Sequence, residues 1–350
     1  MEEILTVAEY FAGIGLVRMG LESAGWNVVF ANDFSEKKHE MYQTFFPDVA
    51  NDYVIDDIFN LESEFVPLTT LATCSFPCID LSLAGNMNGI QGKHSSAFWG
   101  FIKILSAQRE NAPSMVLVEN VPGWLYSNNG ADFRVTVKAL NDLGYKCDVF
   151  TLNAQSFTPQ SRLRVFLVGI KTEKKAQSLD VLLARPKSLA TNRLKNSVFA
   201  NRQLNWLPLD IPTPPPLRNG SLTEIVEEMT ENDSRWWSQA EVDRHIAMMD
   251  LSHYHRVMEL ASREETTYRT FFRRRRTEAQ RAEVRDDDIA GCLRTAVGGS
   301  GKQFLIRAGQ GELRMRTMTP REYARLQGVP DHFSITVNGV QALTGFGDAV

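Results

Sequence analysis

The sequence is poor in cysteine and has no long hydrophobic segment. Its four cysteines are too few and too scattered for a disulfide framework: Cys74, Cys78, Cys147 and Cys292. No apolar run approaches the roughly 18 residues that a membrane-spanning helix needs, and residues 1–5 lack the features of a signal peptide. A zinc site is disfavoured, because Cys74 and Cys78 have no companion pair and few histidines lie nearby. We therefore expect a protein of the reducing cytoplasm that binds no membrane and no metal.

Charge differs between the two halves of the chain. The first 170 residues carry 11 basic and 19 acidic residues, a net charge of −8, whereas the rest carry 27 and 23, a net charge of +4. Six arginines crowd residues 269–281, with only Glu278 opposing them: Arg269, Arg273, Arg274, Arg275, Arg276 and Arg281. Such a block is often only a solvated face, but beside Phe271 and Phe272 it is also typical of a nucleic-acid-binding surface. The pattern favours a polyanionic partner.

Hydrophobic periodicity predicts an α/β fold. It indicates a strand over residues 7–10, a glycine turn over 11–15, a helix over 16–24 and a second strand over 28–31. This order is that of the first half of a doubly wound nucleotide-binding fold. Further helices are predicted over 97–108 and 132–143, and further strands over 115–118, 145–152 and 165–169. We expect them to complete one mostly parallel sheet.

The composition of the sequence changes near Lys171, where the alternation of apolar and polar residues weakens and prolines become frequent. We expect residues 171–315 to form a second, smaller domain, inserted between residues 1–170 and 316–350 of the first. A helix should begin after Thr319, because Pro320 at its first position and Glu322 at its third form a typical N-terminal cap. We expect Arg321, Glu322 and Arg325 on the exposed face of this helix.

The glycine turn alone is a weak signal for a ligand. Gly13, Gly15 and Gly20 are spaced G-x-G-x4-G, which departs from the dinucleotide fingerprint and argues against a nicotinamide dehydrogenase. A tight turn without any ligand would explain them equally well. Asp33, about 20 residues past the turn, is placed to accept hydrogen bonds from ribose hydroxyls, although an aspartate there also suits a helix N-cap.

A Pro-Cys turn ends a short apolar stretch at residues 73–78. We expect the thiol of Cys78 at the carboxyl edge of the sheet, where ligands bind in open α/β folds, although most single cysteines are structural. A buried strand delivers Glu119 to the same edge, where burial should raise its pKa so that it can carry a proton. Arg162 and Arg164 supply the positive field that favours a thiolate. This combination suits attack on an electron-poor pyrimidine ring.

Five motifs stand in a definite order along the chain. They are Phe11-Ala-Gly-Ile-Gly15, Phe76-Pro-Cys78, Glu119-Asn-Val121, Gln160-Ser-Arg-Leu-Arg164 and the run from Arg316 to Pro330. In order and spacing they resemble those of the cytosine-specific DNA methyltransferases that modify carbon 5, across nearly the whole chain except the insert. The resemblance implies the fold of S-adenosylmethionine-dependent methyltransferases with a target-recognition domain. It also implies an enzyme of the restriction-modification type, and we expect it to act on duplex DNA as a monomer.

The resemblance implies roles for individual residues. Cys78 would attack carbon 6 of a cytosine swung out of the duplex, and Glu119 would bond ring nitrogen 3 and the exocyclic amine. Arg164 would hold the carbonyl oxygen, Arg162 would support the thiolate and Gln160 would order the loop. Cofactor contacts are implied for Phe11, Gly13, Ile14, Gly15, Asp33, Phe34, Asp57, Ile58, Pro77, Phe98, Asp348 and Ala349. DNA contacts are expected for Ser82, Gln160, Gly298, Gly299 and Ser300, and phosphate contacts for Arg273, Arg274, Arg275 and Arg276.

Two positions depart from the family pattern. Ile79 stands where Gln is common, and Asp348 stands where Asn is common.

Two other functions would use most of the same motifs. A transfer-RNA cytosine methyltransferase is disfavoured by the arginine-rich insert, and a silent DNA-binding relative is disfavoured by the intact Cys78, Glu119 and Arg164.

Overall fold

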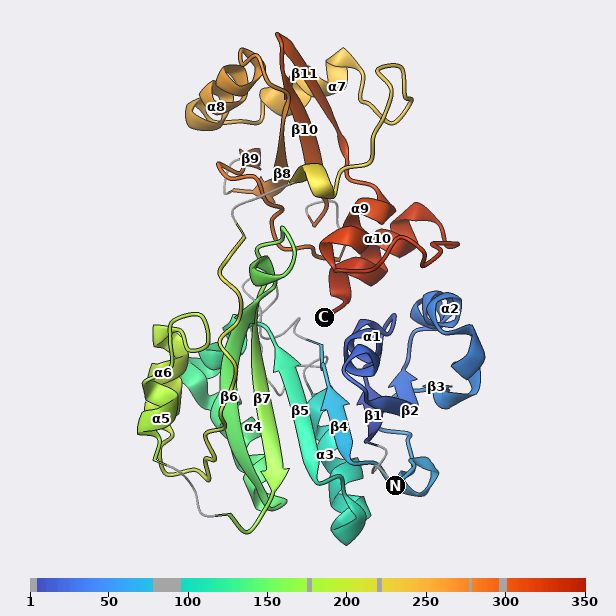
Figure 1. Ribbon diagram of the computed structural model, residues 1–350, viewed down its shortest axis with the longest axis vertical. Helices are drawn as coiled ribbons and strands as arrows, with labels where there is room; N and C mark the ends of the chain where they lie inside the picture. The colour runs from blue at the N-terminus through green and yellow to red at the C-terminus, as the bar shows by residue number, and fades with distance from the viewer. Residues whose placement is uncertain (1–4, 78–95, 175–177, 219–221, 277–278, 296–300) are drawn as a thin grey trace. The chain divides into compact units, whose positions relative to one another are not determined.

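The computed structural model describes residues 5–77, 96–174, 178–218, 222–276, 279–295 and 301–350 (Figure 1). Contacts between residues divide the chain into two compact units. Met1–Asn153, Leu163–Pro214 and Val350 form the first unit, and Ala154–Arg162 and Pro215–Ala349 form the second. These bounds differ from the expected ones at residues 171 and 316, and the division of functions between two domains stays a prediction.

The first unit is built on a seven-stranded sheet of order β3-β2-β1-β4-β5-β7-β6. Its strands are β1 (Thr6–Tyr10), β2 (Asn27–Asp33), β3 (Tyr53–Ile55), β4 (Leu71–Cys74), β5 (Met115–Asn120), β6 (Tyr145–Asn153) and β7 (Leu163–Lys171). Strands β3, β2, β1, β4 and β5 pair in parallel, and β7 is antiparallel to its neighbours β5 and β6. The prediction of a mostly parallel sheet is confirmed.

Helices cover both faces of this sheet. They are α1 (Leu16–Ser23), α2 (Glu36–Phe45), α3 (Ala97–Gln108), α4 (Ala131–Asp142), α5 (Asp180–Leu183) and α6 (Asn192–Ala200). On one face, Phe101 of α3 and Phe133 of α4 pack with Val116 in the main hydrophobic core. On the other face, Leu21 of α1 packs against Val7 and its neighbours. The sheet is therefore doubly wound, as predicted.

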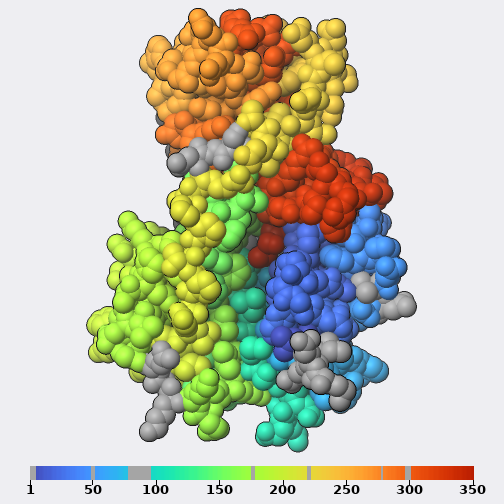
Figure 2. All heavy atoms as spheres, viewed as in Figure 1, coloured from blue at the N-terminus to red at the C-terminus, as the bar shows by residue number. Residues whose placement is uncertain are grey.

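The chain after α6 returns along β6. The backbone N–H of Leu207 donates to the carbonyl oxygen of Cys147 at 2.7 Å. Arg185 donates twice to the buried carboxylate of Asp148, at 2.8 and 2.6 Å. In Figure 2 this returning segment, coloured yellow-green, lies on the surface of the first unit. These contacts explain why residues 171–214 belong to this unit.

The second unit has a four-stranded antiparallel sheet of order β11-β10-β8-β9. Its strands are β8 (Thr267–Arg275), β9 (Gln280–Val284), β10 (Gln303–Gly309) and β11 (Glu312–Thr317), and its helices are α7 (Gln239–Ile246), α8 (Leu251–Ala261), α9 (Pro320–Leu326) and α10 (Gly339–Asp348). Val257 and Leu260 of α8 pack on Phe271 and Phe304 of the sheet in a separate core. None of the helices in the described part of the chain has the length and apolar character needed to cross a membrane.

Candidate active site

The glycine turn between β1 and α1 has an uncommon backbone conformation. Phe11, Gly13 and Gly15 have φ angles of 59°, 58° and 83°, in the left-handed region that side chains disfavour. Gly15 is also sterically required, because a Cβ there would lie 2.5 Å from the ring of Phe46 and 2.8 Å from that of Tyr42. The turn thus brings backbone groups to the start of a helix and packs closely against the rings of Phe46 and Tyr42.

Asp33 holds the glycine turn from the end of β2. Its Oδ2 accepts from the N–H of Gly13 at 3.1 Å, and its Oδ1 accepts from the N–H of Ser35 at 3.0 Å. The alternative interpretation of Asp33 as a helix N-cap is wrong, because Ser35 caps α2. A carboxylate has about four acceptor positions, so Asp33, which is 4% exposed, keeps unused acceptor positions beside the turn.

The other expected cofactor residues differ in exposure. Phe34 is 68% exposed and Asp57 is also exposed, whereas Ile14, Ile58 and Phe98 are buried. Phe98 packs against Phe76, with ring centroids 5.4 Å apart. Buried side chains support their neighbours from within the core, so direct side-chain contact is open to Phe34 and Asp57 rather than to Phe98.

The end of β5 carries the predicted acid. Glu119 is 6% exposed, and its Oε1 lies 3.0 Å from the Nε of Arg164 at the start of β7. Arg164 Nη1 also donates to the carbonyl oxygen of Leu163 at 2.9 Å. The guanidinium offsets the cost of removing the carboxylate from water. Sequence reasoning placed both residues at this edge but did not foresee that they form an ion pair.

Cys78 lies outside the described residues, as do Ser82, Gly298, Gly299 and Ser300. The backbone leading to Cys78 is held by Asn120, whose buried Nδ2 donates to the carbonyl oxygen of Phe76 at 3.1 Å. The Oδ1 of Asn120 accepts from the N–H of Val121 at 2.8 Å. One amide side chain therefore joins the end of β5 to the chain two residues before the predicted nucleophile. The sequence signal for this contact was only the position of Asn120 beside Glu119.

Gln160 is fully buried in the second unit, and its amide is used within the protein. Its Nε2 donates to the carbonyl oxygen of Leu326 at 2.9 Å and to Gln327 Oε1 at 3.2 Å, and its Oε1 accepts from the N–H of Leu293 at 3.1 Å. The expectation that Gln160 contacts DNA is corrected by this burial. Its other expected role, ordering the loop, agrees with these contacts.

Arg162 belongs to the second unit and holds two of its segments. Its Nη1 donates to the carbonyl oxygen of Leu293 at 3.0 Å and lies 3.5 Å from Cys292 Sγ. Its Nη2 donates to the carbonyl oxygen of Ala349, which also accepts from Gln327 Nε2 at 3.1 Å. Sequence reasoning missed this positioning of the C-terminal turn, and the predicted support of a thiolate by Arg162 stays untested.

The C-terminal turn itself is tightly packed. Asp348 ends α10 and is exposed, and Ala349 caps the helix. A Cβ on Gly347 would lie 2.3 Å from the carbonyl oxygen of Arg294, so only glycine fits there. The carboxylate of Asp348 is therefore presented at a turn with little freedom to shift.

The predicted DNA-binding arginines are not equivalent. Arg273 lies over the ring of Phe304, with its Cζ 5.1 Å from the centroid. Arg274 and Arg276 have side chains 55% exposed and share Glu283 as an acidic neighbour. Arg275 is exposed at the end of β8, and Arg276 helps to line a hollow of about 970 Å³ beside α8. Packing thus occupies Arg273 and leaves Arg274, Arg275 and Arg276 facing water.

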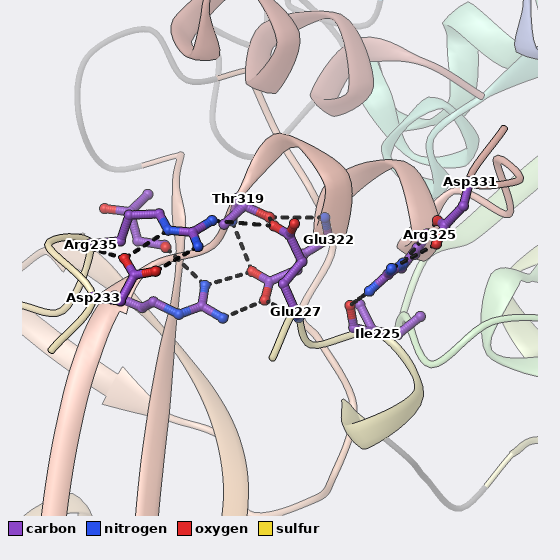
Figure 3. A network of polar contacts seen from close by, with 10 residues as sticks. Ile225, Glu227, Asp233, Arg235, Thr319, Glu322, Arg325 and Asp331 are labelled. Carbon is purple, nitrogen blue, oxygen red and sulfur yellow. Dashed lines mark hydrogen bonds and ion pairs between the residues drawn. The ribbon is translucent and has the colours of Figure 1, made fainter. Parts of the chain in front are cut away.

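A buried polar network surrounds the start of α9 (Figure 3). Arg316 and Glu322 are fully buried and form a two-pronged ion pair, in which Arg316 Nη1 lies 2.7 Å from Glu322 Oε2. Glu322 also accepts from the N–H groups of Thr319 at 2.8 Å and Glu227 at 3.0 Å. The predicted N-terminal cap is confirmed, because Thr319 and Glu322 form a capping box. The prediction that Glu322 is exposed is wrong, because its carboxylate pairs with the buried guanidinium of Arg316.

Glu9 in β1 is a buried acid that sequence reasoning overlooked. It is 1% exposed, and neither of its oxygens has a hydrogen-bond partner among the described residues. Burial raises its pKa to about 8, against the opposing effect of the nearby Arg18. Glu9 is therefore protonated at neutral pH. The signal in the sequence was an acidic residue within an otherwise apolar strand.

No group of three or more His, Cys, Asp or Glu side chains suited to a metal ion occurs within the described ranges. The candidate site consists of a glycine turn, a carboxylate beside it and an acid–arginine pair at the end of β5 and the start of β7. These features lie at the carboxyl edge of the parallel strands, which is where ligands bind in open α/β folds.

Comparison with known proteins assigns the family. The family model for C-5 cytosine-specific DNA methylase matches residues 5–350, and the chain belongs to this family. Its members are S-adenosylmethionine-dependent DNA cytosine-5 methyltransferases, so the protein is an enzyme that uses S-adenosylmethionine as the methyl donor.

Several relatives are type II methyltransferases. M.Bsp6I of Bacillus sp. (strain RFL6) is 30% identical over 197 residues, which cover 55% of this chain and 61% of that protein. M.DsaV of Dactylococcopsis salina is 26% identical over 347 residues, covering 99% of this chain and 82% of that protein. The crystal structure of S. pombe Dnmt2 has a TM-score of 0.63 and 17% identity, covering 99% of this chain and 94% of that one. This last likeness shows the fold alone.

Proposed function

We propose that this enzyme methylates carbon 5 of a cytosine flipped out of a specific duplex DNA sequence, through a covalent adduct with Cys78. The observation that carries the proposal is the Glu119–Arg164 pair. The ion pair holds Glu119 as a carboxylate; once this group takes up a proton, it can donate to ring nitrogen 3 and accept from the exocyclic amine, while the guanidinium donates to the carbonyl oxygen. Side by side, the two groups match the edge of a cytosine and of no other DNA base.

Attack by sulfur explains the need for these two residues. The Cys78 thiolate adds to carbon 6, the 5,6 double bond opens, and the proton of Glu119 neutralises the charge that reaches nitrogen 3. Carbon 5 becomes nucleophilic as a result. After methylation the carbon-5 proton leaves to a base, the double bond re-forms and the thiolate is released. Asn120, by holding the carbonyl of Phe76, keeps the start of the nucleophile's loop in register with Glu119.

The residues around the glycine turn fit the methyl donor. When bound, S-adenosylmethionine supplies an electrophilic methyl group on a sulfonium. We assign its methionine end to Phe11, Gly13, Ile14 and Gly15, its ribose to Asp33 and its adenine to Phe34, Asp57 and Ile58. Pro77, Asp348 and Ala349 complete the assignment, and the buried side chain of Phe98 supports the site from the core. The fit is supported by an exposed aromatic ring next to a carboxylate that has spare acceptor capacity.

DNA binding is assigned to the basic insert. Arg274, Arg275 and Arg276 face water and are suited to phosphates, which fix register without reading sequence. We propose that the insert within residues 171–315 also carries the base-reading groups. We further propose that the protein works as a monomer in the cytoplasm, as the modification component of a restriction-modification system.

Covalent trapping tests the mechanism. Duplex DNA that contains 5-fluorocytosine should form a denaturation-resistant adduct with the wild-type protein in the presence of S-adenosylmethionine, because fluorine cannot leave as a proton does. Cys78→Ser should form none. An equal adduct with both proteins would refute Cys78 as the nucleophile, and labelling of transfer RNA instead of duplex DNA would refute the substrate. Methylating random duplex DNA, followed by bisulfite sequencing, would identify the recognition sequence.

A further inference from the structure

The glycine turn is strained and needs external support. Phe11 is a non-glycine residue with a φ of 59°, a strained conformation that persists only where neighbouring groups enforce it. Two groups act on Gly13: Asp33 accepts from its N–H, and Tyr53 Oη donates to its carbonyl oxygen at 3.1 Å. Both the N–H and the carbonyl oxygen of Gly13 are therefore held by side chains from other strands.

The position of Tyr53 is fixed by packing. Its side chain is buried, and its ring lies 4.6 Å from that of Tyr42 and 4.6 Å from that of His39, both in α2. Burial raises the pKa of Tyr53 far above its usual value, so the hydroxyl stays protonated and acts as a donor. The ring cannot turn its hydroxyl elsewhere without opening this aromatic cluster.

Tyr53 also begins the segment expected to meet the adenine. The strand β3 runs from Tyr53 to Ile55 and leads into Asp57. Asn32 at the end of β2 donates from Nδ2 to the carbonyl oxygens of Val54 at 3.0 Å and Asp56 at 2.9 Å. A shift of β3 would therefore move both the loop at the adenine end and the hydroxyl that holds the turn.

We propose that Tyr53 is a positioning residue that couples the two ends of the cofactor site. Its hydroxyl transmits the position of β3 to the glycine turn, so that the turn is formed before the cofactor binds. The inference rests on the proposed placement of the cofactor at this turn. Prior formation of the turn removes an ordering cost from binding, and its loss should weaken affinity without altering the chemical step.

The test compares two tyrosines of the same cluster. Tyr53→Phe removes the bond to Gly13, whereas Tyr42→Phe keeps its ring beneath the turn and removes only the bond that its hydroxyl accepts from Arg18 Nη1 at 2.7 Å. Calorimetric titration with S-adenosylhomocysteine should show a Kd about fivefold higher for Tyr53→Phe and unchanged for Tyr42→Phe. The KM for S-adenosylmethionine should follow the Kd, with kcat unchanged. Amide hydrogen exchange over residues 12–16 should quicken in Tyr53→Phe alone.

The outcomes distinguish a failure of the coupling by Tyr53 from a failure of the cofactor site. If the wild-type protein binds S-adenosylhomocysteine and Tyr53→Phe binds equally well, with unchanged exchange in the turn, the coupling by Tyr53 is refuted while the cofactor site stands. Equal weakening by both variants would also refute it, because that result would indicate general loosening of the cluster. If the wild-type protein binds no S-adenosylhomocysteine, the cofactor site fails and the inference fails with it.

Discussion

The arginine beside the predicted catalytic acid is nearly buried, whereas the arginines of the β8–β9 hairpin stand mostly in water. Arg164 has 13% of its side chain exposed and is 3.0 Å from Glu119. Arg274 and Arg276 each have 55% exposed. Removing a buried arginine leaves its acidic partner as an uncompensated buried charge. The loss of an exposed arginine has a smaller effect, because water and salt already screen its charge. Burial therefore separates an arginine held by an internal acid from arginines whose charge is available to a polyanion.

Arg316 extends the comparison within the second unit. It is fully buried like Glu322, and the two tie β11 to the start of α9. Arginine thus forms a buried ion pair in β11 and carries a solvated charge in β8. Variants at these positions should affect different measurable quantities: rate, stability or salt dependence.

The largest effect is expected on the rate of methyl transfer when Glu119 is replaced. Glu119→Gln should lower the rate of methyl transfer by about 10²–10⁴-fold, because the amide cannot give a proton to nitrogen 3. Duplex binding should change little, since the proton matters only as the ring is attacked. Single-turnover rates and filter binding would measure the two. Equal losses in both would contradict the assigned role of Glu119.

Breaking the buried pair should be the next largest change. Arg316→Met leaves the carboxylate of Glu322 buried without its cation, and the free energy of unfolding should fall by about 3–5 kcal/mol. The matched control is Lys138→Ala, which removes an exposed pair with Asp142 and should cost under about 1 kcal/mol. Urea unfolding measures both. Similar costs for the two variants would show that the Arg316 pair is not desolvated in solution.

Glu9 should make stability depend on pH. Its folded-state pKa of about 8 lies above the ordinary value of 4.5, so between these values the folded protein holds a proton that the unfolded chain has lost. The contribution of Glu9 to stability is therefore full below about pH 4.5 and falls as pH rises to about 8, by roughly 1.4 kcal/mol per pH unit. Glu9→Gln should flatten this slope in urea unfolding between pH 5.5 and 8. Parallel slopes would contradict the raised pKa.

Variants in the β8–β9 hairpin should give the smallest effect, and the loss of binding should be similar for all DNA sequences. Arg274→Ala combined with Arg275→Ala should weaken binding to specific and random duplexes alike and reduce the salt slope by about 2. Arg273→Ala provides the contrast, since it should lower thermal stability through its lost contact with Phe304. Titrations at several salt concentrations would measure the slope. Loss confined to one DNA sequence would indicate that Arg274 and Arg275 read bases.

The amino-acid sequence by itself was enough to predict several of the local elements. The helix α3 covers the predicted residues 97–108, and the capping box at Thr319 follows from two residue types three positions apart. Such features depend on periodicity and on sterics between near neighbours, which a single sequence displays. The order of the five motifs likewise indicated the family before any contact was known.

Only the tertiary structure decided how these residues are used. The sequence placed Glu119 and Arg164 at one edge, but their ion pair requires β5 and β7 to lie side by side. Tyr53 meets Gly13 across 40 residues of chain, and Gln160 meets Leu326 across 166. A side chain's partner depends on which distant segments packing brings within about 3 Å, and no spacing along the chain encodes that distance.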